Sequence, residues 1–216
     1  MAIVLYSYFR SSAAFRVRIA LNIKAVEYKI APVHLLKNGG QQHQRAYLEL
    51  NPQELVPVLA VDDVIISQSA AIIEYLEETC PSPAMLPDAA IDRAYVRSLA
   101  QMIACDIHPL NNLRVLQYLK KDVAADDDVR QAWYRHWLRK GFAAFEQRLH
   151  ENDNTGLFCV GDAPGLADVF LIPQVYNALR FDCDMHPYRL IKGIYENCMQ
   201  QTAFADAAPE NQPDAE

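Results

Sequence analysis

Apolar and polar positions follow one pattern up to about residue 80 and another beyond residue 88. In the first part, short apolar runs typical of strands alternate with segments in which apolar residues recur at helical spacing. The pattern predicts strands at 3–9, 27–33, 58–61 and 64–66, and helices at 12–23, 42–50 and 69–79. This order, βαβ followed by αββα, predicts an α/β domain over residues 1–80, with a mixed sheet and helices on its faces.

Beyond residue 88, no segment has the period of a strand. Apolar residues recur there at helical spacing, over 89–118, 129–150, 166–179 and 188–199. This predicts an all-α domain over residues 89–205. Residues 81–88 hold three prolines, which regular helix or interior strand does not accommodate, so they are predicted to be a linker. The last segment, 206–216, combines prolines with several acids and is expected to be disordered.

The length and composition fit one large globular domain or two small ones. The chain has 216 residues, of which 51% are hydrophobic and 22% are charged. Its net charge of −7, with acids and bases interleaved, argues against a nucleic-acid-binding surface, so an anionic ligand must be held by local positive groups. The N-terminus lacks the features of a signal peptide, and the apolar runs are too short to span a bilayer. A cytoplasmic protein is therefore expected.

Cysteine and histidine spacing indicates neither a disulfide framework nor a metal site. The five cysteines are widely separated and include no C-x-x-C pair. Cys105 and His108 stand three apart on a predicted helix, as two metal ligands could, but the sequence offers no second pair of ligands to accompany them. No metal is therefore expected.

The segment from Tyr8 to Leu21 is the most informative part of the sequence for function. A strand ends there, Ser11 and Ser12 follow, and an amphipathic helix begins, so one of the two serines stands where a helix N-cap belongs. Exposed N–H groups and the helix dipole at such a junction stabilise an anion, including a thiolate, and a serine hydroxyl can donate to it. The alternative is that the serines only cap the helix.

Two further segments place polar groups where a ligand could bind. Pro57 precedes an apolar strand; the sequence alone favours a trans bond there, because only about 5–6% of X-Pro bonds are cis. A cis bond would turn the N–H and C=O of Val56 outward, toward an added peptide strand. Gln68 and Ser69 stand at the start of another predicted helix, where a carboxylate could be held.

These three segments together resemble the thioredoxin-like domain of the cytosolic glutathione transferases. The run SSAAFRVRIAL resembles the serine-rich signature of the zeta class, whose members include maleylacetoacetate isomerases and bacterial maleylpyruvate isomerases. The similarity extends to IHPLNNLRVL, CVGDAPGLADVFLIPQV and NALRF in the helical half. It implies a thioredoxin-like N-terminal domain, an all-α C-terminal domain, glutathione as cofactor, a small dicarboxylate substrate and a homodimer.

The resemblance also assigns roles to individual residues. It makes Ser11 the partner of the glutathione thiolate, with Ser12 beside it, and it makes Arg10 and Arg180 the arginines that hold the carboxylates of the substrate. The implied glutathione contacts are Ser11, Ser12, Gln42, Val56, Pro57, Gln68, Ser69, His108 and Asn112. Each arginine could instead be an ordinary surface residue. His108 could serve packing at a kink, because Pro109 follows it.

The expected function is the glutathione-dependent cis–trans isomerisation of maleylacetoacetate to fumarylacetoacetate in aromatic amino acid catabolism. The alternatives are a maleylpyruvate isomerase of the gentisate pathway, an α-haloacid glutathione transferase and a non-catalytic binding protein. The family motif often has cysteine where this chain has Ala13, so a mechanism that uses a protein thiol at that position is unavailable. Arg16 and Arg18 on the first helix are expected to be solvated or ion-paired.

Overall fold

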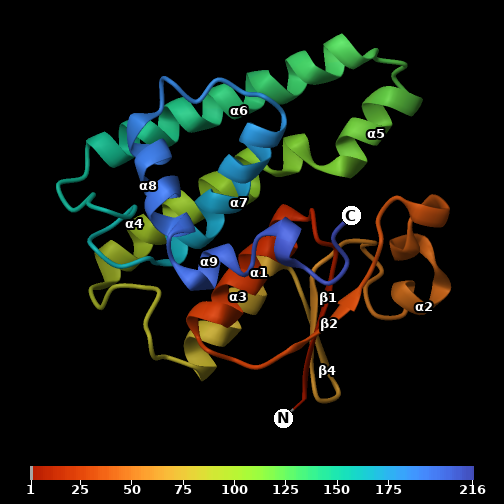
Figure 1. Cartoon of the computed structure of the whole chain (residues 1–216), viewed down its shortest axis with the longest axis horizontal. Helices are drawn as coiled ribbons and strands as arrows, with labels where there is room; N and C mark the ends of the chain where they lie inside the picture. Colours follow the sequence, from red (N-terminus) through yellow and green to blue (C-terminus); the bar gives the residue numbers. More distant parts are fainter. Residues whose placement is uncertain (1) are drawn as a thin grey trace. The chain divides into compact units, whose positions relative to one another are not determined.

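The computed structural model describes residues 2–216 and divides them into two compact units (Figure 1). The first unit consists of the chain up to Ala84 together with Met199–Glu216, and the second is Met85–Cys198. The boundary near Ala84 lies inside the predicted linker 81–88. The end of the chain, in contrast, belongs to the unit that holds the N-terminal segment.

The first unit is built on a four-stranded sheet in the order β2-β1-β3-β4. Its strands are β1 (Ile3–Ser7), β2 (Lys29–Pro32), β3 (Val58–Val61) and β4 (Val64–Ser67). The pair β1–β2 is parallel, and the pairs β1–β3 and β3–β4 are antiparallel. All four residues of β3 are buried, as expected for an apolar run in the middle of a sheet. The sheet is therefore the mixed sheet that the sequence predicted.

The helices of the first unit follow the βαβ and αββα order. They are α1 (Ser12–Ile23), η1 (Lys37–Gly39), η2 (Gln41–His43), α2 (Arg45–Leu48), α3 (Ser69–Thr79), α9 (Thr202–Ala205) and η5 (Pro209–Asn211). Helices α1 and α3 pack against each other. They bury Phe15 and Ile19 from α1 and Ile72 and Ile73 from α3, each at most 1% exposed. Burying four large apolar side chains here stabilises the unit by several kcal/mol, at about 1.5–3 kcal/mol each.

The C-terminal segment is ordered, so the prediction of a disordered tail is wrong. Residues 206–216 form η5 and the turns around it, and Ala207 and Ala208 are at most 1% exposed. Composition suggested disorder because of the prolines and acids. The two alanines are small enough to bury, and Gln212 Nε2 bonds the carbonyls of Asp206 and Ala208 at 2.8 and 2.9 Å.

Arg18 connects this tail to the sheet. The sequence predicts a solvated or ion-paired residue, but Arg18 is 0% exposed and therefore not solvated, and its guanidinium donates hydrogen bonds within the unit. Its Nε donates to the Ala207 carbonyl at 2.9 Å, its Nη1 to Ser7 Oγ at 3.1 Å and its Nη2 to the Phe9 carbonyl at 3.0 Å. A planar guanidinium suits this role because its donors point in several directions at once. Arg16 is likewise buried, at 2% exposed.

The second unit is all-helical. Its elements are α4 (Ala90–Gln101), η3 (Met102–Ile107), η4 (Pro109–Asn111), α5 (Leu113–Lys121), α6 (Asp127–His150), α7 (Leu166–Arg180) and α8 (Arg189–Met199). Helix α7 is buried along most of its length and packs against α4, which makes it the central helix of the unit. The helical pattern over 89–118 is divided between α4 and α5 by the π-helical η3 and by η4, which begins at Pro109.

Asp168 fixes the start of α7. Its Oδ2 accepts from the Gly165 N–H at 2.8 Å, the acid half of the capping arrangement, and its Oδ1 accepts from the Cys159 N–H at 2.9 Å. Burial raises the pKa of Asp168, and these backbone donors oppose the rise. The carboxylate thereby joins the loop before α7 to the helix. Across residues 2–216, no helix combines the length and hydropathy needed to cross a membrane.

Candidate active site

Ser11 caps α1 where the helix follows β1. Its backbone is extended, at φ −72° and ψ 116°, and its Oγ accepts a hydrogen bond from the Ala14 N–H at 3.2 Å. Because the oxygen is the acceptor in that bond, the hydroxyl hydrogen can still be donated to a ligand. The first turn of α1 holds no acidic residue, so no side chain of that turn neutralises the positive end of the helix. This end of α1 can therefore hold an anion.

The two neighbours of Ser11 differ in exposure. Ser12, the first residue of α1, is buried at 4% exposed. Arg10 is exposed, and its guanidinium carbon lies 4.7 Å from the centroid of the Phe9 ring. The charge of Arg10 therefore lies at the surface next to the start of α1, where a carboxylate can reach it.

Gln42, in η2, is buried with an unsatisfied polar atom. Its Nε2 donates to the Leu35 carbonyl at 3.3 Å, whereas its Oε1 has no hydrogen-bond partner within the part of the chain that the structure describes. Gly40, at φ +101°, leaves room for this side chain, because a Cβ there would lie 2.6 Å from Gln42 Nε2. Buried amide oxygens are nearly always hydrogen-bonded. The unpaired Oε1 therefore marks a place where a donor from a ligand fits.

The peptide bond between Val56 and Pro57 is cis, whereas the sequence alone favours trans. The strand pairing of β3 begins at Val58, and within residues 2–216 neither the N–H nor the C=O of Val56 forms a hydrogen bond. The preceding Leu55 carbonyl is held by Tyr47 Oη, which donates to it at 2.7 Å. The chain thus presents a donor and an acceptor next to a fixed loop, and an extended peptide could pair with both.

Gln68 and Ser69 begin α3. Gln68 has φ +72°, a conformation that costs about 1–3 kcal/mol for a residue with a side chain and that recurs at binding sites. Its Nε2 donates to Gln53 Oε1 at 2.7 Å. Ser69 is 7% exposed, and the side chain of Gln68 does not cap the helix. The N–H groups of this 11-residue helix's first turn can therefore bind an anion.

Three predicted site residues lie in the second unit. His108 is the C-cap that follows η3, and its N–H donates to the Ile103 carbonyl at 2.9 Å. Asn112 caps α5, with its side-chain oxygen accepting from the Arg114 N–H at 3.1 Å, a capping role that the sequence did not indicate. Arg180 is the exposed last residue of α7, with its guanidinium carbon 4.6 Å from the centroid of the Phe181 ring. Of the three, His108 and Asn112 lie four residues apart, on either side of η4, whereas Arg180 lies on another helix.

The tail adds acidic groups that the sequence did not single out. The Glu216 carboxylate pairs with Lys37 Nζ and, at 3.3 Å, with His34 Nε2. The hydrogen bond from Lys37 lowers the pKa of Glu216, and His34 adds to the effect. Asp214 Oδ2 accepts from the Phe9 N–H at 3.0 Å. Lys37 and Glu216 are 179 positions apart, so no local pattern could have indicated this contact.

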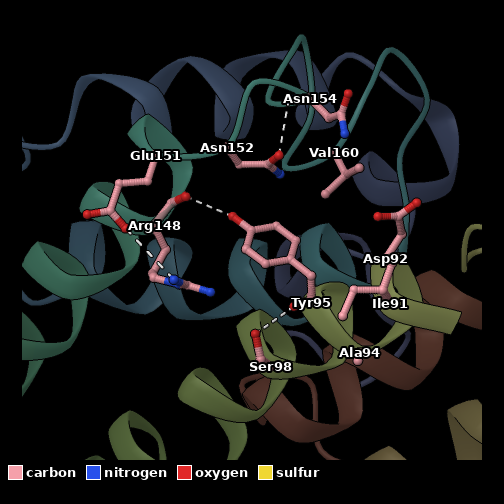
Figure 2. Close-up of a pocket in the computed structure, with 10 residues that line it drawn as sticks. All are labelled: Ile91, Asp92, Ala94, Tyr95, Ser98, Arg148, Glu151, Asn152, Asn154 and Val160. Atoms are coloured by element: carbon pink, nitrogen blue, oxygen red, sulfur yellow. Dashed lines mark hydrogen bonds and ion pairs between the residues drawn. The ribbon is translucent and has the colours of Figure 1, made fainter. Parts of the chain in front are cut away.

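A cavity of about 550 Å³ opens in the second unit. Figure 2 shows Tyr95 in its middle, with its hydroxyl directed at the Arg148 backbone, to whose carbonyl it donates at 2.7 Å. The residues that line the cavity are Ile91, Asp92, Ala94, Tyr95, Ser98, Arg148, Glu151, Asn152, Asn154 and Val160. None of them belongs to the predicted site, so this cavity does not support the predicted chemistry.

Known proteins are similar to this chain, both in its N-terminal domain and over its whole length. The family profile described as Glutathione S-transferase, N-terminal domain, matches residues 10–79. A probable maleylacetoacetate isomerase of Vibrio cholerae serotype O1 is 51% identical over 215 residues, covering 100% of this chain and 99% of that protein.

Two solved structures are similar over nearly the whole chain. A holo structure of a maleylpyruvate isomerase, described as a bacterial zeta-class glutathione S-transferase, matches with a TM-score of 0.96 and 45% identity over 99% of this chain and 100% of that one. A maleylacetoacetate isomerase from Methylobacterium extorquens AM1 with bound malonate and glutathione matches with a TM-score of 0.94 and 39% identity over 99% of both chains.

Proposed function

Because this chain belongs to the zeta class of glutathione transferases, the family of the maleylacetoacetate isomerases, we propose that it converts maleylacetoacetate to fumarylacetoacetate with glutathione as cofactor. A relative named probable maleylacetoacetate isomerase is 51% identical over the full chain. One solved maleylacetoacetate isomerase holds glutathione and malonate, and another holds dicarboxyethyl glutathione and citrate. The fold is that of the glutathione transferases, which supports the proposal.

The unsatisfied groups of the first unit carry the proposal. The buried Gln42 Oε1 lacks a donor, and the N–H and C=O of Val56 are unpaired. Gln68 and Ser69 stand at a helix N-terminus that can hold a carboxylate. Glutathione is a short peptide with two carboxylates and several amide groups, so it supplies a partner for each. His108 and Asn112 are assigned to the same tripeptide by the family resemblance.

Ser11 and the start of α1 are proposed to stabilise the glutathione thiolate. When bound, glutathione supplies a sulfur nucleophile that adds reversibly to the cis double bond and so permits rotation about it. The Ser11 hydroxyl donates toward that sulfur, and the positive end of α1 favours its anionic form over the thiol, whose free pKa is about 8.5. Ser12 lies beside Ser11 in the same turn. Ala13 offers no thiol of its own.

Arg10 and Arg180 are proposed to hold the dicarboxylate. Both are exposed at the ends of regular elements, Arg10 after β1 and Arg180 at the end of α7, and each lies against an aromatic ring. A guanidinium pairs with a carboxylate through two parallel hydrogen bonds. In a chain of net charge −7, such local positive groups are what an acidic substrate needs. They also stabilise the negative charge that develops next to the substrate carbonyl.

The test is glutathione-dependent loss of the maleyl absorbance, with maleylacetoacetate and maleylpyruvate assayed in parallel. Ser11→Ala is expected to lower kcat by about 10²-fold, the cost of one hydrogen-bond donor to a developing anion. Asp126→Ala is the matched control, because it removes a helix N-cap in α6, where Asp126 accepts from the Val129 N–H at 2.8 Å, far from any predicted site residue in sequence. Turnover without glutathione, or an equal loss in both variants, would contradict the proposal.

Arg180→Ala separates substrate binding from cofactor binding. It is expected to raise KM for the diacid by about tenfold or more, the loss of one charge-assisted hydrogen-bonded pair, and to leave the affinity for glutathione nearly unchanged. Lys140→Ala, an exposed cation in the same unit, is the control. An equal loss of affinity for both ligands would refute the division of labour.

We further propose a cytoplasmic homodimer that acts in aromatic amino acid breakdown. Val64 and Ile65 on the edge strand β4 are 61% and 40% exposed, and Ile91 on α4 is 77% exposed. Large apolar side chains at an unpaired sheet edge favour a protein contact. Val64→Lys is expected to shift the mass measured by sedimentation from dimer to monomer. An unchanged mass would remove β4 from the proposed interface.

A further inference from the structure

Gly141 is a helical glycine with no turn or left-handed backbone to explain it. It lies in the interior of α6, where glycine is about 1 kcal/mol less favourable than alanine. A Cβ at this position would lie 2.2 Å from Cδ1 and 2.3 Å from Cγ1 of Ile107. Contacts that short do not occur between carbon atoms, so Ile107 occupies the space that any other residue at 141 would fill.

Ile107 is the last residue of η3 and is 1% exposed. The next residue is His108, whose N–H closes the π-type bond to Ile103 at 2.9 Å. The side chain of Ile107 is therefore one of the contacts of this turn with α6, and it is the contact next to His108 in the chain.

A second contact fixes the other end of the same segment. Trp133 of α6 donates from Nε1 to the Leu110 carbonyl at 2.7 Å, two residues before Asn112. Gly141 and Trp133 lie eight positions apart, about two turns along one helix, so α6 holds both ends of the segment from Ile107 to Asn112. Between them, Asn111 Nδ2 donates to the Tyr134 carbonyl of α6 at 3.4 Å.

We propose that Gly141 is a positioning residue for glutathione binding. By admitting Ile107 against α6, it fixes where His108 and Asn112 lie, and so acts on the ligand through them. The inference rests on the proposed function, in which His108 and Asn112 contact glutathione.

The test compares the full-length enzyme with Gly141→Ala, Ile107→Ala and the double variant. Each protein is assayed for KM and kcat, for the dissociation constant of glutathione by calorimetry, and for Tm. Gly193→Ala is the matched control, since Gly193 is interior to α8 in the same unit and a Cβ there meets nothing within 4 Å.

Gly141→Ala is expected to weaken glutathione binding about tenfold, the equivalent of one lost hydrogen bond, while Gly193→Ala leaves it unchanged. Ile107→Ala opens a gap at the contact and is expected to weaken binding several-fold. The double variant should recover binding to within about twofold, because the added Cβ would lie 3.6 Å from the Cβ of residue 107, an ordinary contact.

The outcomes separate the inference from the proposed function. A lower Tm with unchanged glutathione binding in Gly141→Ala and Ile107→Ala would make the contact merely structural and overturn the inference alone. If Gly141→Ala does not fold, the other two variants still test the inference. Unchanged glutathione binding in Ile107→Ala would overturn it, and so would a double variant that does not recover glutathione binding. Absence of glutathione binding by the unsubstituted enzyme would overturn the proposed function and this inference with it.

Discussion

Replacing Arg18 with alanine should cost the first unit more stability than any surface substitution in it. Arg18 is 0% exposed and donates to the Ala207 carbonyl, the Phe9 carbonyl and Ser7 Oγ. Truncation leaves two buried carbonyls without a donor, at about 1–3 kcal/mol each, and the hydroxyl can rotate to another partner. Including the lost packing of the stem, we expect the free energy of unfolding to fall by about 4 kcal/mol.

Urea unfolding followed by circular dichroism measures this loss, and limited proteolysis with mass spectrometry locates it. The variant should become cleavable within the tail before the rest of the unit unfolds, because the Ala207 bond is its link to α1. Arg45→Ala is the control: Arg45 has a 94% exposed side chain and pairs with Glu49 at 3.2 Å, a surface pair worth less than about 1 kcal/mol. Equal losses in the two variants, or a tail that stays protected in Arg18→Ala, would refute the reasoning.

Three further predictions concern the rest of the molecule. Asp168→Asn should lower the unfolding free energy by about 1–3 kcal/mol in urea titrations, because an amide has one oxygen for two backbone donors; an unchanged midpoint would contradict the capping role. Cys105 is exposed while burial raises the pKa of Cys159 and Cys198, so a thiol reagent should label Cys105 first, and Cys105→Ser should remove the fast phase of the native reaction. The pKa of Glu216 is lowered, so its pairing with Lys37 and His34 stabilises the tail above the ordinary carboxyl pKa of 4.5 and is lost as the pH falls through the folded-state pKa. Proteolysis at the tail should therefore increase on acidification in the wild type and not in Glu216→Gln.

The sheet and the helix starts could be predicted because their signals are local. The alternation in β1, the buried run of β3 and the serine before α1 each lie within a few residues of the structure that they specify. The N-cap could be narrowed to Ser11 or Ser12 for the same reason, since an N-cap bonds an N–H only two or three positions ahead; the structure shows that it is Ser11.

The features that the sequence did not indicate depend on distant contacts. The burial of Arg18 follows from carbonyls that the tail brings to it, 189 positions away in the case of Ala207. Ile107, in the π-helical turn before His108, occupies the space beside Gly141, which lies 34 positions away in another helix. Periodicity predicts which face of a helix is apolar, but it contains no information about which residue of a neighbouring element fills that face.

The position of the chain's last residue has a practical consequence for anyone who produces this enzyme. Glu216 pairs with Lys37 and His34, a few positions before Gln42, whereas the backbone N–H of Ala2 bonds Asp62 in the hairpin between β3 and β4. A purification tag fused after Glu216 would extend from the loop that carries a proposed glutathione contact. A tag placed before Ala2 starts at the hairpin instead, and is the better choice for kinetic work.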